Sequence, residues 1–255
     1  MLRLRPLLLV ALGVVLILLS LGVRRVRDAG PVGPGLRTPT GEGRSAQAAR
    51  TDPRLLLPDT TAPGSPAQRE AIRAAITAAG SSVYLPAMFA ETDSVLRRWT
   101  DADAGGLRVA YVTGGVPDWT VADQEIARAA FRSWERVGLT VRFVEVLDTA
   151  DAQVVVRWVP RFSIDRSGQT DLSWDPRGHV RHAAIQLALT DSGGRAISPE
   201  GLRAVALHEV GHALGLPHSD REDDLMFPTT RHPVLTERDI ATIQLLYQLA
   251  PGPIR

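Results

Sequence analysis

The amino-acid sequence predicts an α+β domain built on a mixed, twisted sheet. Three observations support this fold class: several apolar segments of strand length, one amphipathic helix among them, and two further helices near the C-terminus. The chain has 255 residues, of which 44% are hydrophobic and 22% are charged. This composition is sufficient for one well-packed core with appended segments, so we expect a single globular domain.

Residues 1–27 are expected to form a membrane anchor or a signal sequence. The run from Leu7 to Val23 is almost entirely apolar and has arginines on both sides. Its length is close to that of the shortest membrane spans, about 17 residues, and exceeds the usual core of a signal peptide, about 7 to 15 residues. We favour an uncleaved anchor, while the small residues of Ser20-Leu21-Gly22 leave cleavage and secretion as the alternative. In both cases the remaining chain is expected outside the cytoplasm.

A flexible linker and a helical segment are expected to follow. Residues 28–66 are rich in Gly, Pro, Ser, Thr and Arg, which is typical of a linker. Ser65, followed by a proline, is a helix start, and Gly80 is expected to end that helix. A second short helix is predicted from Asp93 to Trp99. Together, residues 67–100 are expected to form a helical lead-in.

Residues 101–255 are expected to form the main domain. Its first helix begins at Thr120 and ends at Gly138, because large apolar residues recur between them at helical spacing. Runs of apolar and β-branched residues predict four strands around this helix, namely Leu107–Val112, Leu139–Val146, Ala152–Val159 and His182–Leu189. No strand is predicted in the polar stretch from Arg161 to Arg181.

A later helix carries a candidate metal site. Ser198 and the proline after it begin this helix, which runs to Leu214. His208 and His212 are four residues apart, so both imidazoles project from one face and can share a metal ion. Glu209 is rotated by about 100° around the helix axis and flanks the metal without ligating it.

The residues after this helix predict a third ligand. Gly215 can adopt the left-handed conformation that ends a helix, and Pro217 prevents the helix from resuming. His218 then returns towards the first two histidines. Three neutral imidazoles leave one tetrahedral position open for water, which is the arrangement of a catalytic Zn²⁺ rather than of a structural one.

Composition argues against other classes of function. Lys and Arg number 29 against 28 for Asp and Glu, a net charge of +1, so we expect no nucleic-acid partner. The absence of cysteine rules out disulfides, a thiolate nucleophile and a cysteine-ligated zinc. A metal must therefore be held by histidine and carboxylate, and we expect a monomer.

The motif and the segments after it resemble one family of metallopeptidases. The run from His208 to His218 resembles the zinc signature of the metzincins. Asp224 to Pro228 is similar to the methionine-bearing turn of the matrixin branch, and Ser219 directly after the third histidine fits that branch too. Leu235 to Tyr247 resembles the closing helix of matrixin catalytic domains, and Thr236 and Asp239 are independently expected to form a capping pair at its start. The resemblance covers about Trp99 to Leu249.

This resemblance implies a metzincin-like fold, with an active-site helix and a closing C-terminal helix, and a zinc-dependent metalloendopeptidase. His208, His212 and His218 would be the zinc ligands. Glu209 would be the general base that takes a proton from the zinc-bound water as this water attacks a peptide carbonyl. The protein or peptide substrate is expected to add a strand along Ala183 to Leu189.

Two properties common among matrixins are not expected here. Structural zinc and calcium ions are not predicted, because Asp171, Asp175, His179 and His182 lack the expected spacing. A cysteine thiolate from a pro-segment commonly silences the zinc of matrixins, and this chain has no cysteine. We therefore expect an enzyme that is active as made.

Two hypotheses from other classes remain open. One is a catalytically silent, zinc-stabilised binding domain, against which the presence of Glu209 argues, since a structural site needs no base. The other is a membrane-anchored assembly protein that uses the peptidase fold as a scaffold. An assay of casein hydrolysis with and without a chelator distinguishes both from an enzyme.

Overall fold

The computed structural model describes residues 64–90, 94–100, 105–230 and 233–255. The chain divides into two units, Met1–Asp52 and Pro53–Arg255, and every described residue belongs to the second unit. The predicted anchor or signal sequence, and the predicted linker up to residue 63, lie outside the described residues. None of the helices in the described ranges is long and apolar enough to cross a membrane.

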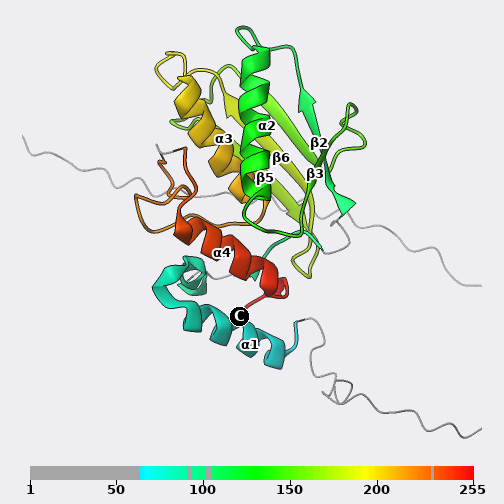
Figure 1. Cartoon of the computed structure of the whole chain (residues 1–255), viewed down its shortest axis with the longest axis vertical. Helices are drawn as coiled ribbons and strands as arrows, with labels where there is room; N and C mark the ends of the chain where they lie inside the picture. The colour runs from blue at the N-terminus through cyan, green and yellow to red at the C-terminus, as the bar shows by residue number, and fades with distance from the viewer. Residues whose placement is uncertain (1–63, 91–93, 101–104, 231–232) are drawn as a thin grey trace, which may run out of the picture. The chain divides into compact units, whose positions relative to one another are not determined.

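A five-stranded mixed sheet is the scaffold of the domain (Figure 1). The strand order is β3-β2-β4-β6-β5. The bounds of these strands are Leu107–Val112 for β2, Phe143–Glu145 for β3, Val154–Val159 for β4, Gly168–Trp174 for β5 and Val180–Ala188 for β6. The neighbours β3, β2, β4 and β6 are parallel, whereas β5 runs antiparallel to β6. The predicted mixed sheet is confirmed, and its four predicted strands correspond to β2, β3, β4 and β6.

The strand β5 was not predicted from the sequence. Among its seven residues only Leu172 is a large aliphatic residue, and all of them are half-buried or exposed, so no apolar alternation marks the strand. Its position at the edge of the sheet explains this composition, because an antiparallel edge strand can leave much of its surface in water.

The presence of β5 corrects the expectation about the substrate strand. Residues 183–188 of β6 are paired with β4 on one side, and residues 183–187 are paired with β5 on the other. Both hydrogen-bonding edges of β6 are therefore occupied there. The prediction that a substrate adds to Ala183–Leu189 is wrong, because β6 lies inside the sheet.

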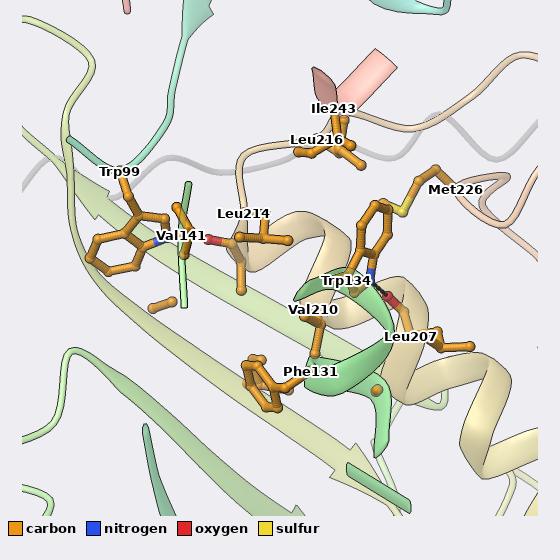
Figure 2. Packing of buried hydrophobic residues seen from close by; sticks show 14 of the residues in the cluster. Trp99, Phe131, Trp134, Val141, Leu207, Val210, Leu214, Leu216, Met226 and Ile243 are labelled. Carbon is orange, nitrogen blue, oxygen red and sulfur yellow. Dashed lines mark hydrogen bonds between the residues drawn. The ribbon is translucent and has the colours of Figure 1, made fainter. Parts of the chain in front are cut away.

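Two helices pack side by side over the sheet, α2 (Val121–Glu135) and α3 (Pro199–Ala213) (Figure 1). A capping box begins α2: the Thr120 side chain accepts from the Asp123 backbone N–H, and the Asp123 carboxylate accepts from Thr120 N at 2.8 Å. The buried face of α2 ends in Trp134, whose indole N–H donates to Leu207 O at 2.9 Å (Figure 2). This contact joins α2 to the backbone of α3.

Segments from both ends of the described chain close the domain. They are α1 (Pro66–Ala79), two 3₁₀ helices (Gly80–Ser82 and Leu85–Ala90), β1 (Val95–Leu96), α4 (Glu237–Gln248) and β7 (Gly252–Pro253). The helix predicted from Asp93 to Trp99 is wrong where it is described, because β1 pairs antiparallel with β7. Asp93 itself lies outside the described residues. This pairing joins segments far apart in the sequence, so local helix preference is overridden.

The lead-in packs against α4 and the C-terminal segment. Tyr84 OH donates to the Asp239 carboxylate at 3.2 Å, and Arg238 donates to Val83 O at 3.1 Å. Arg73 donates to the carbonyl of Ile254 at 3.4 Å. The apolar side chains of the lead-in join the main core of the domain, and they include Ile72, Ile76, Tyr84, Leu85, Met88 and Leu96.

Candidate metal centre

The helix α3 is buried on nearly all sides, which fixes the orientation of its side chains. Ser198 caps its start. Near its end, the indole N–H of Trp134 donates to Leu207 O, and that of Trp99 donates to Ala213 O, both at 2.9 Å. Figure 2 shows the first of these bonds within the packed aromatic and aliphatic side chains around α3. Both bonds fix the backbone of α3, the helix that bears the candidate ligands His208 and His212.

Three imidazole nitrogens converge at the C-terminal end of α3. Nε2 of His212 lies 3.0 Å from Nε2 of His208 and 3.2 Å from Nε2 of His218. The ligand atoms of these residues all lie within 4.8 Å of one another. His208 is buried, His212 is half-buried and His218 is exposed, so the cluster is open to solvent on the side of His218. The three residues singled out in the sequence therefore lie together.

The other ring nitrogens of two histidines are bonded to backbone carbonyls. Nδ1 of His208 donates to Leu225 O, and Nδ1 of His212 donates to Leu216 O, each at 2.8 Å. Because a carbonyl oxygen only accepts, each Nδ1 carries the hydrogen, and the neutral ring presents a lone pair on Nε2. Lone pairs this close together repel unless a proton or a cation lies between them. The donor set therefore fits Zn²⁺, for which imidazole nitrogens oriented by such bonds are ordinary ligands.

Burial keeps these rings in the form that binds metal. It lowers the pKa of His212 to about 3 and that of His218 to about 4, and neighbouring histidine rings add to the effect. The pKa of His208 is also lowered, mainly by burial. A histidine must be neutral to ligate a metal ion, so the cluster is ready to bind one at neutral pH.

A glycine turn brings the third histidine back to the cluster. Gly215 has a φ of 104°, and its N–H donates to His212 O at 2.9 Å. A Cβ at this position would also lie 3.0 Å from the carbonyl carbon of Arg97. Both the backbone conformation and the close approach require glycine, as expected for the turn that places His218.

The turn around Met226 packs against the same end of α3. Met226 is completely buried beside Gly211, where only a residue without a side chain leaves room for it. Its carbonyl accepts from Ser219 N at 2.8 Å, so the residue directly after His218 is tied to this turn. The turn also supplies the carbonyl of Leu225 that holds His208.

Asp239 holds this turn in place, a role that sequence reasoning missed. It was predicted only as the capping partner of Thr236, and its carboxylate does accept from Thr236 N at 2.9 Å. The same carboxylate accepts from Leu225 N at 3.0 Å and from Met226 N at 3.3 Å. The cap of α4 is therefore connected through Leu225 to His208. No sequence signal distinguishes these bonds from an ordinary cap.

Glu209 is directed from α3 towards the edge strand β5. It is 5% exposed, and its Oε2 lies 2.6 Å from the hydroxyl oxygen of Thr170. Burial raises the pKa of Glu209 to about 7, while the hydrogen bond from Thr170 acts in the opposite direction. A carboxyl group with a pKa near the working pH is suited to general acid and base catalysis. Thr170 was missed in the sequence because it lies in the strand that was not predicted.

The other candidate ligands lie in or next to β5 and β6. His179 Nδ1 lies 3.2 Å from the Asp175 carboxylate, which also accepts from Arg181 at 2.7 Å. Asp171 accepts from Gln169 at 3.0 Å. A metal ion could be held by a group of three or more histidine or acidic side chains whose ligand atoms lie close together. Among the described residues, the group that meets this condition is the histidine triad, whose ligand atoms lie within 4.8 Å of one another. The expectation of one metal ion stays a prediction.

Comparison with known proteins places this site in a family. The family model for matrixins matches residues 115–248, more than half of the chain. The chain therefore belongs to the matrixin family of peptidases, and the resemblance noted in the sequence is confirmed. The α+β fold with its mixed sheet agrees with this membership.

Individual matrixin relatives match over shorter segments. The chain is 30% identical over 141 residues to metalloendoproteinase 1-MMP of Arabidopsis thaliana, covering 50% of this chain and 38% of that protein. It is 47% identical over 55 residues to interstitial collagenase B of Mus musculus, covering 20% of this chain and 12% of the relative. It is 50% identical over 52 residues to matrix metalloproteinase-9 of Canis lupus familiaris, covering 19% of this chain and 7% of that protein. The matched segments thus span well under half of the length of these relatives.

Proposed function

We propose that this protein is a zinc-dependent metalloendopeptidase that hydrolyses peptide bonds in proteins or peptides. The observation that carries the proposal is the convergence of three imidazole Nε2 atoms, 3.0 and 3.2 Å apart, at the end of the helix that also bears Glu209. Membership of the matrixin family supports the same conclusion. His208, His212 and His218 would hold the zinc ion, and Glu209 would be the catalytic residue.

The chain's own groups can then be assigned steps in the reaction. Zinc, when bound, supplies Lewis acidity, which polarises a peptide carbonyl and makes a water molecule more acidic. Glu209 removes a proton from the attacking water and returns it to the nitrogen of the leaving amine. Its buried carboxylate, with a pKa of about 7, is suited to both proton transfers near neutral pH. The hydrogen bonds on Nδ1 of His208 and His212 keep these rings oriented throughout.

We infer that an extended substrate pairs with the outer edge of β5. One edge of β5 is paired with β6, and β5 is the last strand in the sheet order. Thr170 on this strand contacts Glu209, so a peptide along β5 would pass beside the base. Addition of a strand grips the peptide through its backbone, which gives affinity without a sequence requirement. Preference for particular side chains would then come from other surfaces.

The test compares hydrolysis of fluorescein-labelled casein with bound zinc in the purified full chain. The wild type should contain one zinc ion, lose activity to a chelator and regain it with added zinc. Glu209→Gln should keep its zinc and lose at least about 10²-fold in rate, because a general base contributes that much. His218→Ala should lose zinc, whereas the control His179→Ala should keep zinc and activity, since His179 is bonded to Asp175.

Each result discriminates between hypotheses. A His218→Ala variant with a full complement of zinc contradicts the three-histidine assignment. Wild-type rates in Glu209→Gln contradict its role as the base. A wild type that binds one zinc but hydrolyses no casein favours the silent, zinc-stabilised binding domain.

We also propose that the peptidase domain works outside the cytoplasm. The support is the apolar run from Leu7 to Val23, which suits a membrane anchor or, as the alternative, a signal sequence that is removed. Since these 255 residues include no cysteine, none of them can silence the zinc as a thiolate, and we propose that the enzyme is active as made. Substrate access would then restrict its activity.

A further inference from the structure

We propose that Thr170 is a positioning residue for Glu209, and that its hydroxyl holds one oxygen of the catalytic carboxylate so that the other is left for proton transfer. This inference rests on the proposed function, because it assumes that Glu209 is the general base. It adds a second element of the fold, the edge strand β5, to a catalytic centre otherwise carried by α3 and the turn after it.

The geometry of the contact supports a strong hydrogen bond. Thr170 Oγ1 lies 2.6 Å from Oε2 of Glu209 and 3.0 Å from the backbone oxygen of Glu209. A hydroxyl donates a single hydrogen, and 2.6 Å is typical of an O–H bond to an ionised carboxylate. The hydroxyl therefore donates to Oε2, and Oε1 keeps its accepting capacity for another partner.

A second residue of the same strand, Gly168, leaves space for the side chain of Glu209 because it has no side chain of its own. Gly168 and Thr170 are two residues apart, so they occupy the same face of β5. A Cβ at position 168 would lie 2.7 Å from Cγ of Glu209 and 2.7 Å from Cγ1 of Val205. The backbone of Gly168 does not have a positive φ, so space and not conformation requires glycine here. One residue of β5 thus makes room for the carboxylate, and the other holds it.

The hydrogen bond from Thr170 restricts the position of the Glu209 carboxylate, and the rate of the reaction depends on that position. A glutamate side chain has three rotatable bonds, and a misplacement of about 1 Å can cost about 10²-fold in rate. Glu209 is buried, so few water molecules compete for its carboxylate. Thr170 is itself held by the pairing of β5 with β6, where it lies opposite Ile185. The base is therefore fixed against the strand along which we place the substrate.

The experiment uses variants that separate the hydroxyl from the shape of the side chain. Thr170→Val removes the hydroxyl and keeps the β-branched shape, whereas Thr170→Ser keeps the hydroxyl. Thr170→Ala is a second hydroxyl-free variant, so the test does not depend on one replacement. Thr149→Val makes the same change at an exposed position in the turn between β3 and β4 and serves as the control. The substrate is one fluorogenic peptide, selected from a quenched peptide library by its turnover with the wild-type full chain.

Loss of the hydroxyl should act on the chemical step. We expect Thr170→Val and Thr170→Ala to lower kcat by about 10-fold or more, since a hydrogen bond to a charged group is lost. KM and zinc content should stay at the wild-type values, while Thr170→Ser and Thr149→Val should keep wild-type kcat. In a Glu209→Gln background, Thr170→Val should cause no further loss, because the two residues act as one unit.

The outcomes separate this proposal from the proposed function. Wild-type kcat in both hydroxyl-free variants overturns the positioning role, and so does a Thr170→Ser variant as impaired as Thr170→Val. A loss of zinc in the hydroxyl-free variants also overturns it, since the effect would then lie in metal binding. If the wild type has no activity, or if Glu209→Gln is fully active, the proposed function fails and the positioning role fails with it.

Discussion

Gly211 lies where α3 packs against the turn that contains Met226, and Gly211→Ala tests that packing directly. The residue lies within α3 and has no positive φ, so the backbone accepts alanine. A Cβ there would lie 3.0 Å from Cζ2 of Trp134 and 3.1 Å from Cε of Met226, and would overlap the sulfur of Met226. Figure 2 shows Met226 beside the ring of Trp134.

Two opposing effects determine the magnitude. Alanine is favoured over glycine in a helix interior by about 1 kcal/mol. An extra methyl group in a packed core costs about 1 to 3 kcal/mol. The upper end is expected, because Met226 and Trp134 are both completely buried and Trp134 is also held by its bond to Leu207. The net loss in the free energy of unfolding should therefore be about 2 kcal/mol.

The assay is urea unfolding in the presence of a chelator, so that loss of zinc does not contribute. Gly201→Ala is the control on the same helix, because its Cβ would meet only Ile197 and Ser198, at 3.2 and 3.3 Å, near the surface. It should change stability by less than about 1 kcal/mol in either direction, because the gain from alanine is offset by these two tight contacts. Combining Gly211→Ala with Met226→Ala should cost less than the sum of the two single changes, since the added methyl group fills part of the cavity. A Gly211→Ala protein as stable as Gly201→Ala would refute the reasoning.

Two further predictions concern pH and the lead-in. In the metal-free protein, the folded state keeps His212 and His218 neutral, whereas the unfolded chain protonates histidines below about pH 6.5. The free energy of unfolding should therefore fall as the pH drops from about 6.5 towards about 4. Glu209 opposes this fall by one proton, because its pKa is raised in the folded state from the ordinary 4.5 to about 7. When the free energy of unfolding, measured in urea, is plotted against pH, the slope should be smaller for His218→Gln than for the wild type, and an equal slope contradicts this. A chain that begins at Arg98 should not fold, because it lacks seven buried side chains worth about 1.5 to 3 kcal/mol each, comparable with the whole stability of a domain, about 5 to 15 kcal/mol. A chain that begins at Gly64 should melt cooperatively by circular dichroism, and a cooperative transition in the shorter chain contradicts the prediction. The seven side chains are Ile72, Ile76, Val83, Tyr84, Leu85, Met88 and Leu96.

The parts of the site that depend on local geometry could be predicted from the sequence. His208 and His212 share a helix face because four residues make about one turn, and Gly215 ends that helix whatever surrounds it. The caps at Ser198 and Thr236 depend on residues three positions away, and both are present in the structure. The family resemblance also came from these contiguous motifs, and the family match confirms it.

Contacts between distant segments were decided only by the tertiary structure. The strand β5 has almost no apolar pattern, so its existence depends on the edge of β6 that it covers. Thr170 could not be connected to Glu209, nor Asp239 to the Met226 turn, because each pair meets only when the sheet and helices pack together. Bringing two segments far apart in the chain together costs chain entropy, and the packing of the whole domain offsets this cost. Residues next to the hydrogen bond in the sequence do not offset it, so the bond leaves no periodic pattern there.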